Sequence, residues 1–259
     1  MKKIIILILI FILVILYLFK EQIREGFQTP PANIADVWYI NLDRSSDRRT
    51  YIENETSKLL IPVKRWSAVD GSKLTDEDFN KHNIPAWSRP SFALESKQKT
   101  RFGEIGCFLS HKSLLQHLNT LDTPSDMAHL ILEDDAKIDD NFIEKWNISI
   151  NTVDPSWDII FVGLLGNNVN DVKSGIGKPE YITGTHAYVV KQSSLDKIIA
   201  HIDIIYDPID EVYAKGINKL NIYALSPSKI NQGGAPTSTI ANTIERYTDY
   251  MPPKAFIML

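Results

Sequence analysis

The sequence of 259 residues contains a single cysteine, Cys107. One cysteine excludes a disulfide within the chain, and we take it to exclude a zinc site built on cysteine as well. Packing must therefore stabilise the fold, and the chain has the side chains for it, because 44% of its residues are hydrophobic and 10% are aromatic. This composition predicts one globular domain with a sizeable core.

The sequence also lacks an excess of positive charge. Its 28 lysines and arginines are outnumbered by 32 acidic residues, which gives a formal net charge of -4. A nucleic-acid surface needs a stripe of basic side chains to neutralise phosphates, so we expect no nucleic-acid partner. A local basic cluster could still bind a small anion.

Polar residues are missing from the segment Ile4–Phe19, which Lys2, Lys3, Lys20 and Arg24 flank. A helix of about 16 residues spans roughly 24 Å, slightly less than a hydrocarbon core of ~30 Å. We predict a single N-terminal transmembrane helix over residues 1–20 and hence a chain anchored in a membrane as a single-pass protein. The alternative is a cleaved signal peptide, but no small-x-small cleavage site follows the run. Basic residues at both ends leave the side of the membrane open.

Residues 21–35 have no hydrophobic periodicity and include Pro30 and Pro31, so we expect a short stalk before a domain over 36–259. In that domain strand-like and helical patterns alternate. The expected strands are 37–42, 63–69, 128–132, 158–162, 185–191 and 221–225; the expected helices are 46–60, 102–119, 140–150, 193–202 and 208–217. We also expect a short capped helix at Thr75, a long polar loop over 83–100 and an extended tail over 233–259. The alternation predicts an α/β sheet flanked by helices, with ligands beyond the carboxyl ends of its strands.

The strand 128–132 leads directly into three carboxylates, Glu133, Asp134 and Asp135. In an extended segment successive side chains alternate, so Glu133 and Asp135 would point to one side and Asp134 to the other. Two carboxylates on one side suit a hard divalent cation, Mn²⁺ or Mg²⁺, that also binds a diphosphate. The alternative is a solvated turn that starts the next helix.

Six blocks of the sequence together resemble glycosyltransferase family 25, which includes lipooligosaccharide and collagen galactosyltransferases. The blocks are Trp38–Arg44 with Asp47–Arg49, Ala68–Gly71, Gly103–His111, Leu132–Asp135, Gly184–Tyr188 and Pro208–Glu211. The resemblance implies a GT-A-type sheet that binds a nucleotide sugar, a UDP-sugar donor, a divalent metal and transfer that inverts the anomeric centre. It further implies transfer of galactose or a related hexose to a glycan, glycolipid or glycoprotein acceptor.

The resemblance also implies roles for individual residues. Asp135 is expected to contact the metal directly, with Glu133 and Asp134 acting through water or the ribose. The remaining donor-binding candidates come from the other blocks, and they are Asn41, Asp43, Arg44, Arg48, Asp70, Gly71, Glu104, Ser110, His111 and His186. Several have plainer readings: Arg48 and Arg49 as surface ion-pair partners, Asp70 with Gly71 as a turn, and His111 and His186 as core histidines. Cys107 is read as core.

An inverting transfer needs a carboxylate that takes the proton of the acceptor hydroxyl. The resemblance points to Asp210, and second to Glu211. Asp207 reads as the N-cap and Pro208 as the first residue of a helix, which would place Asp210 at its third position. An acid there is also explained by capping and by the helix dipole alone.

Two other functions remain as alternatives. One is a non-catalytic, membrane-tethered module that binds sugar nucleotide or glycan with the same fold, and the other is a metal-dependent phosphoesterase. Gln232 is a weak further candidate for the donor side. Asn54 and Asn147 lie in acceptor patterns for N-glycosylation, which would apply to a lumenal domain.

Overall fold

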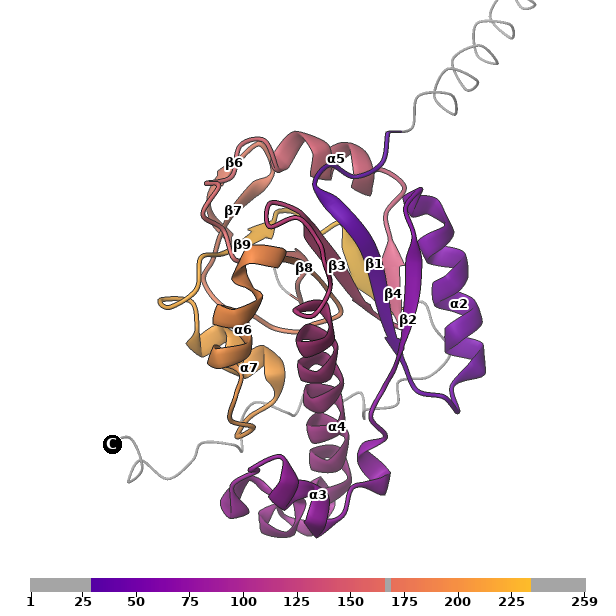
Figure 1. Ribbon diagram of the computed structural model, residues 1–259, viewed down its shortest axis with the longest axis vertical. Coiled ribbons are helices and arrows are strands. Elements are labelled where there is room, and N and C mark those ends of the chain that lie inside the picture. The colour runs from indigo at the N-terminus through magenta and orange to yellow at the C-terminus, as the bar shows by residue number, and fades with distance from the viewer. Residues whose placement is uncertain (1–28, 166–168, 234–259) are drawn as a thin grey trace, which may run out of the picture.

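The computed structural model describes residues 29–165 and 169–233, which form an eight-stranded mixed sheet with helices on both faces (Figure 1). The order of its strands is β2-β1-β3-β8-β5-β9-β7-β6, and β4 and β10 form a separate two-stranded ribbon. The strands are β1 (Ile34–Asn41), β2 (Val63–Ser67), β3 (Ala128–Glu133), β4 (Ala136–Ile138), β5 (Ile159–Gly163), β6 (Val169–Lys173), β7 (Ile176–Pro179), β8 (Ala187–Lys191), β9 (Ile222–Leu225) and β10 (Ile230–Gln232). The helices are α2 (Ser46–Thr56), α3 (Asp76–Lys81), α4 (Glu95–Leu118), α5 (Phe142–Ser149), α6 (Leu195–His201) and α7 (Ile209–Lys215).

Strands β1, β2 and β3 are parallel, so their carboxyl ends lie at one edge of the sheet. Strand β8 runs antiparallel between β3 and β5. Its first residues therefore lie beside the last residues of β3, and Leu132 pairs with Ala187. This topology brings the end of β3 and the start of β8 to the same place, which is where the acidic turn begins.

The side chains of β1 and β3 alternate between two hydrophobic cores, as expected for strands buried on both faces. Trp38 and Ile131 belong to the core beneath α4, α6 and α7, whereas Tyr39 and Leu132 belong to the core beneath α2 and α5. Figure 1 shows α2 covering one face near β1 and α4 crossing the other. The prediction of an α/β sheet with helices on both faces is confirmed.

Helix α4 begins at Glu95, seven residues before the predicted start, so the prediction of a loop over the whole of 83–100 is wrong. The two prolines of that segment, Pro85 and Pro90, precede the helix, and the residues from Glu95 to Thr100 are polar helix formers that carry no apolar stripe. Two 3₁₀ turns, η3 (Ala86–Ser88) and η4 (Pro90–Phe92), occupy the rest of the segment.

Helix α7 begins at Ile209 with Pro208 as its flanking residue, so the prediction of Asp207 as its N-cap is wrong. Asp207 instead pairs with Lys215 in the last turn of α7. Strands β4, β6, β7 and β10 are additions to the predicted set. They are short, and β6 and β10 are largely exposed, so they carry little of the apolar pattern that reveals a strand.

The predicted membrane segment over 1–20, most of the stalk over 21–35 and nearly all of the tail over 233–259 lie outside the described residues. Within 29–165 and 169–233, no helix is both long and apolar enough to cross a membrane.

Candidate active site

The acidic turn follows β3 at the carboxyl edge of the sheet, and its three carboxylates face two different neighbours. Asp134 and Asp135 both pair with the buried guanidinium of Arg48 on α2, and the Asp135 Oδ2 to Arg48 Nη2 distance is 3.0 Å. Glu133 instead faces α4. The expected alternation, with Glu133 and Asp135 on one side, is wrong because the strand ends at Glu133 and residues 134 and 135 form a turn.

Asp134 and Asp135 are each 8% exposed, so Arg48 supplies one positive charge against two buried carboxylates. Burial raises the pKa of Asp134, although Arg48 and a 2.7 Å hydrogen bond from Asn41 Nδ2 oppose the shift. Burial and the negative charge of Glu133 raise the pKa of Asp135. Among the described residues, Asp135 Oδ1 is a buried oxygen with no hydrogen-bond partner. This carboxylate is therefore suited to accept a cation.

Glu133 lies at the junction of β3, α4 and β8. Its Oε1 accepts a 2.7 Å hydrogen bond from Thr185 Oγ1 and lies 3.3 Å from His111 Nε2. Burial acts to raise the pKa of Glu133, but the hydrogen bonds and charge from His111, together with Thr185, outweigh it and lower the pKa. Glu133 is thus held as a carboxylate.

His111 is fully buried, and its Nδ1 lies 2.8 Å from the hydroxyl of Tyr188. The ring is therefore fixed at both nitrogens, by Tyr188 on β8 and by Glu133 on β3. Cys107 is one helical turn earlier on α4. The ligand atoms of Cys107, His111 and Glu133 all lie within 4.8 Å of one another, which makes these three residues a group that could hold a metal ion.

Asp210 is held by two backbone amides. Its Oδ2 accepts a 2.9 Å hydrogen bond from Gly184 N, and its Oδ1 accepts a 3.0 Å hydrogen bond from Glu211 N. Burial raises the pKa of Asp210, although these hydrogen bonds oppose the shift, and the charge of Glu133 contributes to the increase. Gly184 has a φ of +81°, which favours glycine at this position. Asp210 therefore lies close enough to Glu133 for the charge of Glu133 to affect its pKa.

Glu211 accepts a 2.5 Å hydrogen bond from the hydroxyl of Tyr181. Burial raises its pKa too, although the hydrogen bond from Tyr181 opposes the shift. The side chain is thus already paired, which favours Asp210 over Glu211 as a base.

The polar residues that end β1 form a connected group. Asn41 is buried and links the acidic turn to Arg65, whose Nη2 donates a 2.9 Å hydrogen bond to the Asn41 carbonyl. Arg65 also pairs with Asp43, and Arg44 pairs with Asp70. Asn41 and Asp43 are therefore linked to Asp134 through one network, and Arg44 with Asp70 forms a separate pair after β1 and β2.

Gly71 and Ser110, also predicted to bind the donor, have structural roles. A Cβ on Gly71 would lie 1.9 Å from the carbonyl oxygen of Phe102, so the close approach that this glycine permits is to α4. Ser110 is 1% exposed and donates to Gly106 O at 2.6 Å while accepting from Val69 N at 2.8 Å. Its hydroxyl thus fixes α4 to the segment that follows β2.

Glu104 and His186 complete the predicted set. Glu104 pairs with Arg101 at 3.2 Å. His186 is 1% exposed, and its Nε2 lies 3.1 Å from the carbonyl of Ile230, so Nε2 donates the hydrogen bond and Nδ1 carries the lone pair. Burial lowers the pKa of His186, which favours the neutral ring. Its Nδ1 is buried without a hydrogen-bond partner in the described part of the chain.

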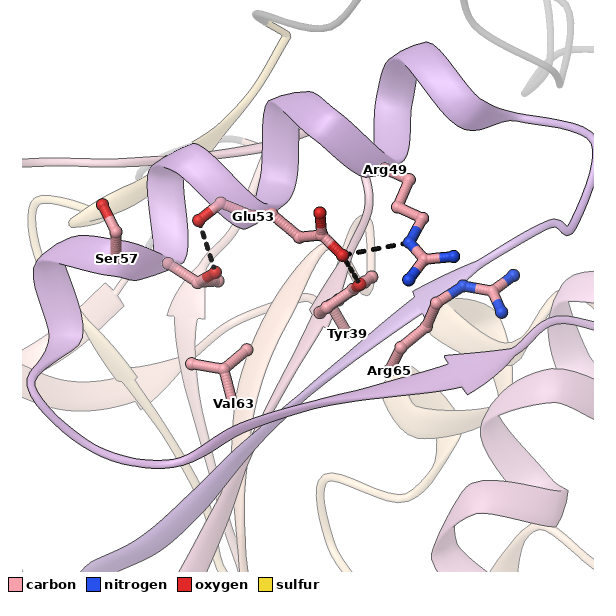
Figure 2. A pocket seen from close by; sticks show the side chains of 7 residues that line it. Tyr39, Arg49, Glu53, Ser57, Val63 and Arg65 are labelled. Carbon is pink, nitrogen blue, oxygen red and sulfur yellow. Dashed lines mark hydrogen bonds and ion pairs between the residues drawn. The ribbon is translucent and has the colours of Figure 1, made fainter.

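A cavity of about 380 Å³ lies between α2 and strands β1 and β2 (Figure 2). Its lining includes Tyr39, Glu53 and Arg49, which form one network: the Tyr39 hydroxyl and Arg49 Nε both donate to Glu53 Oε1, at 2.6 and 3.0 Å. Figure 2 shows Arg49 and Arg65 at the same end of the cavity. This cavity does not contain the acidic turn, and the polar groups of its network already satisfy one another.

Three residues that lie around His111 and Glu133 were not predicted as site residues: Cys107, Thr185 and Tyr188. Cys107 was read as core, yet its spacing of four residues from His111 places both on one face of a helix, and that spacing was the available signal. The exclusion of any cysteine-containing zinc site was too broad, because one cysteine can join a histidine and a carboxylate. Thr185 and Tyr188 lie in the Gly184–Tyr188 block, which was the available signal, but their partners Glu133 and His111 are distant in sequence.

Comparison with known proteins identifies the family. Residues 35–213 match the model of glycosyltransferase family 25 (LPS biosynthesis protein). The chain belongs to glycosyltransferase family 25. All six blocks that carry the resemblance fall inside the matched region.

Curated family 25 relatives show similar levels of identity. A glycosyltransferase 25 family member of Aedes aegypti is 26% identical over 177 residues, which cover 65% of this chain and 28% of the relative. Procollagen galactosyltransferase 2 of Homo sapiens is 28% identical, covering 63% of this chain and 27% of the relative. A probable inactive glycosyltransferase 25 family member 3 of Rattus norvegicus is 27% identical, covering 65% and 28%. The chain thus spans less than a third of the length of these relatives.

A solved glycosyltransferase involved in the glycosylation of the major capsid of PBCV-1 covers 72% of this chain, and this chain covers 68% of it. The identity is 10% and the TM-score is 0.30, a similarity too weak to bear on function.

Proposed function

We propose that this family 25 chain is a metal-dependent glycosyltransferase of GT-A type that moves galactose or a related hexose from a UDP-sugar to a glycan, glycolipid or glycoprotein acceptor with inversion. The observation that carries the proposal is the cluster of the acidic turn, Asn41 and Arg48 at the edge where β1 and β3 end. Ligands of open α/β sheets bind at such an edge.

The residues of the turn fit a divalent cation. Asp135 offers a buried carboxylate oxygen that accepts no hydrogen bond within the described residues, and carboxylate oxygens are preferred ligands of Mn²⁺ and Mg²⁺. Asp135 would hold the metal, with Glu133 and Asp134 acting through water or the ribose. The cation would supply stabilisation of negative charge on the leaving diphosphate.

Arg48 has two tasks in this proposal. It neutralises part of the charge that Asp134 and Asp135 bring into a buried region, and its planar guanidinium suits a diphosphate oxygen as well as a carboxylate. It therefore holds the two carboxylates in place before the donor binds.

Asp210 is proposed as the base. The acceptor oxygen forms a bond to the anomeric carbon while the bond from that carbon to the diphosphate breaks, and Asp210 takes the acceptor's proton. Its amide hydrogen bonds from Gly184 and Glu211 fix the carboxylate without using all of its lone pairs. Burial makes it a stronger base than an exposed aspartate, because it raises the pKa.

The experiment is a UDP-release assay with a panel of UDP-sugars at increasing Mn²⁺. Asp135→Asn should reduce metal-dependent release by more than about 100-fold, since the interaction of a metal with the leaving group contributes several kcal/mol. Asp139→Asn is the matched control, because Asp139 is half-buried and lies just beyond β4. Undiminished release by Asp135→Asn would overturn the metal assignment.

The alternative is a non-catalytic module that binds sugar nucleotide or glycan. Arg48 favours it, since its guanidinium pairs with both Asp134 and Asp135, and relatives of similar identity include probable inactive members. Binding of UDP without any UDP release from the sugar panel would support this alternative.

A further inference from the structure

We propose that Cys107, His111 and Glu133 bind a thiophilic divalent cation of the Zn²⁺ type, at a site separate from the metal position of Asp135. Their ligand atoms lie within 4.8 Å of one another, and they come from one face of α4 and from the end of β3. The site goes beyond the proposed transfer and does not depend on it.

The separation of two of the ligand atoms matches a metal site. Zinc bonds to nitrogen and oxygen at about 2.0–2.2 Å, so two such ligands at a tetrahedral angle lie roughly 3.3–3.5 Å apart. His111 Nε2 and Glu133 Oε1 are 3.3 Å apart. Sulfur, nitrogen and oxygen form a donor set that zinc accepts, and three protein ligands leave the fourth position open.

Each of two ligands has an orienting partner. The Tyr188 hydroxyl lies 2.8 Å from His111 Nδ1 and so directs Nε2 toward the cluster, while Thr185 Oγ1 donates to Glu133 Oε1 at 2.7 Å. Metal-bound histidines commonly engage their second nitrogen in this way, which fixes the ring and its tautomer.

The charge around the cluster also favours a cation. Negative charges of Glu133, Asp210 and Asp135 act on Cys107 and, together with burial as the main cause, raise the pKa of its thiol. The same field attracts a divalent ion. When the ion binds, the thiol loses its proton to solvent and the sulfur–metal bond forms, so the thiolate, the Glu133 carboxylate and a neutral His111 balance the two positive charges.

Access is available from one side. His111 is fully buried, but Cys107 is half-buried and the Glu133 side chain is 21% exposed. An ion can therefore reach the cluster from the side of Glu133, next to the acidic turn.

The test is a Co²⁺ titration of the full chain in detergent, after removal of metals with a chelator. We expect one Co²⁺ per chain to give a near-ultraviolet thiolate-to-cobalt band and visible bands typical of four-coordinate cobalt, and to be displaced by Zn²⁺. Cys107→Ser should abolish the thiolate band and weaken binding by at least about 10-fold, the smallest loss seen even when only a ligand's partner is removed. Circular dichroism checks that the variant is folded.

Tyr188→Phe provides a second, milder variant, since it keeps the packing of the ring and removes only the hydroxyl. It should keep the thiolate band and weaken Co²⁺ binding by about 10- to 100-fold. Asp135→Asn and His82→Gln are the matched controls, and both should leave the cobalt spectrum unchanged. Cobalt that binds without a thiolate band, or equally well to Cys107→Ser, would overturn the site.

Mn²⁺-dependent UDP release, measured on the same samples, keeps the two proposals distinguishable. A thiolate band in a chain that releases no UDP would refute the transfer and support the site. UDP release without any thiolate band would support the transfer and refute the site.

Discussion

At the scale of the residue, two carboxylates with raised pKa values differ in what holds them. Asp135 shares a guanidinium with Asp134, whereas Asp210 is held by backbone amides and forms no ion pair within residues 29–165 and 169–233. A carboxylate fixed by neutral donors can gain a proton without breaking an ion pair. Asp210 is therefore the better suited of the two to proton transfer.

Asp210→Asn removes the base while keeping the size of the side chain. It should lower kcat by about 100-fold or more, as loss of a general base does, and change the donor KM by much less. Asp207→Asn, just before α7, is the matched control. Equal losses in kcat and donor affinity would indicate that Asp210 only caps α7.

The pH dependence of Asp210 follows from the direction of its shift. Burial raises its pKa above 3.8, so the carboxylate gains a proton at a higher pH than an exposed aspartate would. The wild-type kcat/KM should therefore fall as the pH decreases through this raised pKa, and the part of the falling limb that Asp210 causes should be missing from the residual activity of Asp210→Asn. Initial rates across a pH series, with donor and Mn²⁺ held constant, provide the measurement.

Sequence reasoning brought residues to one edge of the sheet where the ends of the strands could be predicted. Asn41, Arg48, Asp134 and Asp135 do come together, because the ends of parallel strands meet at one edge. It failed where a residue's partner was distant in sequence. The residues around Cys107 in the sequence do not indicate its proximity to Glu133, because Glu133 lies on another element of the fold. A cysteine on an apolar stripe is therefore predicted to be a core residue.

At the scale of the element, helix α4 is packed against the turn that follows β2 with almost no space between their backbones. A Cβ on Gly106 would lie 2.6 Å from Gly71 N and 2.9 Å from the Val69 carbonyl oxygen. These are backbone atoms, so no side chain can move aside. The pair of glycines sets the distance at which α4, and with it Ser110 and His111, lies from the sheet.

Gly106→Ala should therefore destabilise the chain. Alanine favours a helix over glycine by about 1 kcal/mol, but overpacking of a rigid contact costs about 1–3 kcal/mol, so the clash should prevail. Thermal or urea unfolding measures the change. Gln116→Ala, at an exposed position of the same helix, should stay within about 0.5 kcal/mol of wild type. A Gly106→Ala chain as stable as wild type would contradict the packing argument.

Asp158 ties β5 to α6 and to the start of β9. Its carboxylate accepts 2.7 Å hydrogen bonds from Ser194 Oγ and Asn221 N and pairs with Lys197. Burial acts to raise its pKa, but these partners outweigh it and lower the pKa below 3.8. The contribution to stability is thus complete above pH 3.8 and is lost as the pH falls through the folded-state pKa.

Asp158→Asn should lower the free energy of unfolding at neutral pH by about 1–3 kcal/mol, since it weakens a buried acceptor with three partners. It should also reduce the acid-dependent loss of stability below pH 4. Urea unfolding from neutral to acidic pH compares the two chains, with Asp154→Asn, whose carboxyl also has a lowered pKa but is exposed, as the control. If the free energy of unfolding had the same pH dependence in wild type and Asp158→Asn, this role of Asp158 would be contradicted.

The elements that could be predicted are those with strong periodicity. Buried strands such as β3 and β5 and the apolar half of α4 were located within a few residues. The polar first half of α4 and the largely exposed strand β6 were missed because neither carries an apolar pattern, and the buried strand β7 was missed because it has only four residues. Their structure follows from tertiary contacts, for example the buried hydrogen bonds between Arg101 and Ser88.

At the scale of the whole molecule, the described fold and the predicted anchor occupy separate parts of the sequence. The family match begins at residue 35, and the sheet begins at Ile34, after the apolar run of Ile4–Phe19. Deletion of residues 1–28 should therefore move the chain from the membrane fraction to the supernatant with its thermal unfolding unchanged. Fractionation of cells that express each form measures the distribution. Equal membrane association of both forms would contradict an N-terminal anchor.

The ribbon of β4 and β10 brings residues near the end of the described chain into contact with Asp135 and His186. Gly233 N donates to the Asp135 carbonyl, Gln232 Nε2 lies 3.4 Å from Asp135 Oδ2, and Ile230 O pairs with His186. These three residues come after the region that matches the family model, which ends at 213. A substitution in β10 alone would therefore change the surroundings of Asp135 and His186 while leaving the matched region as it is.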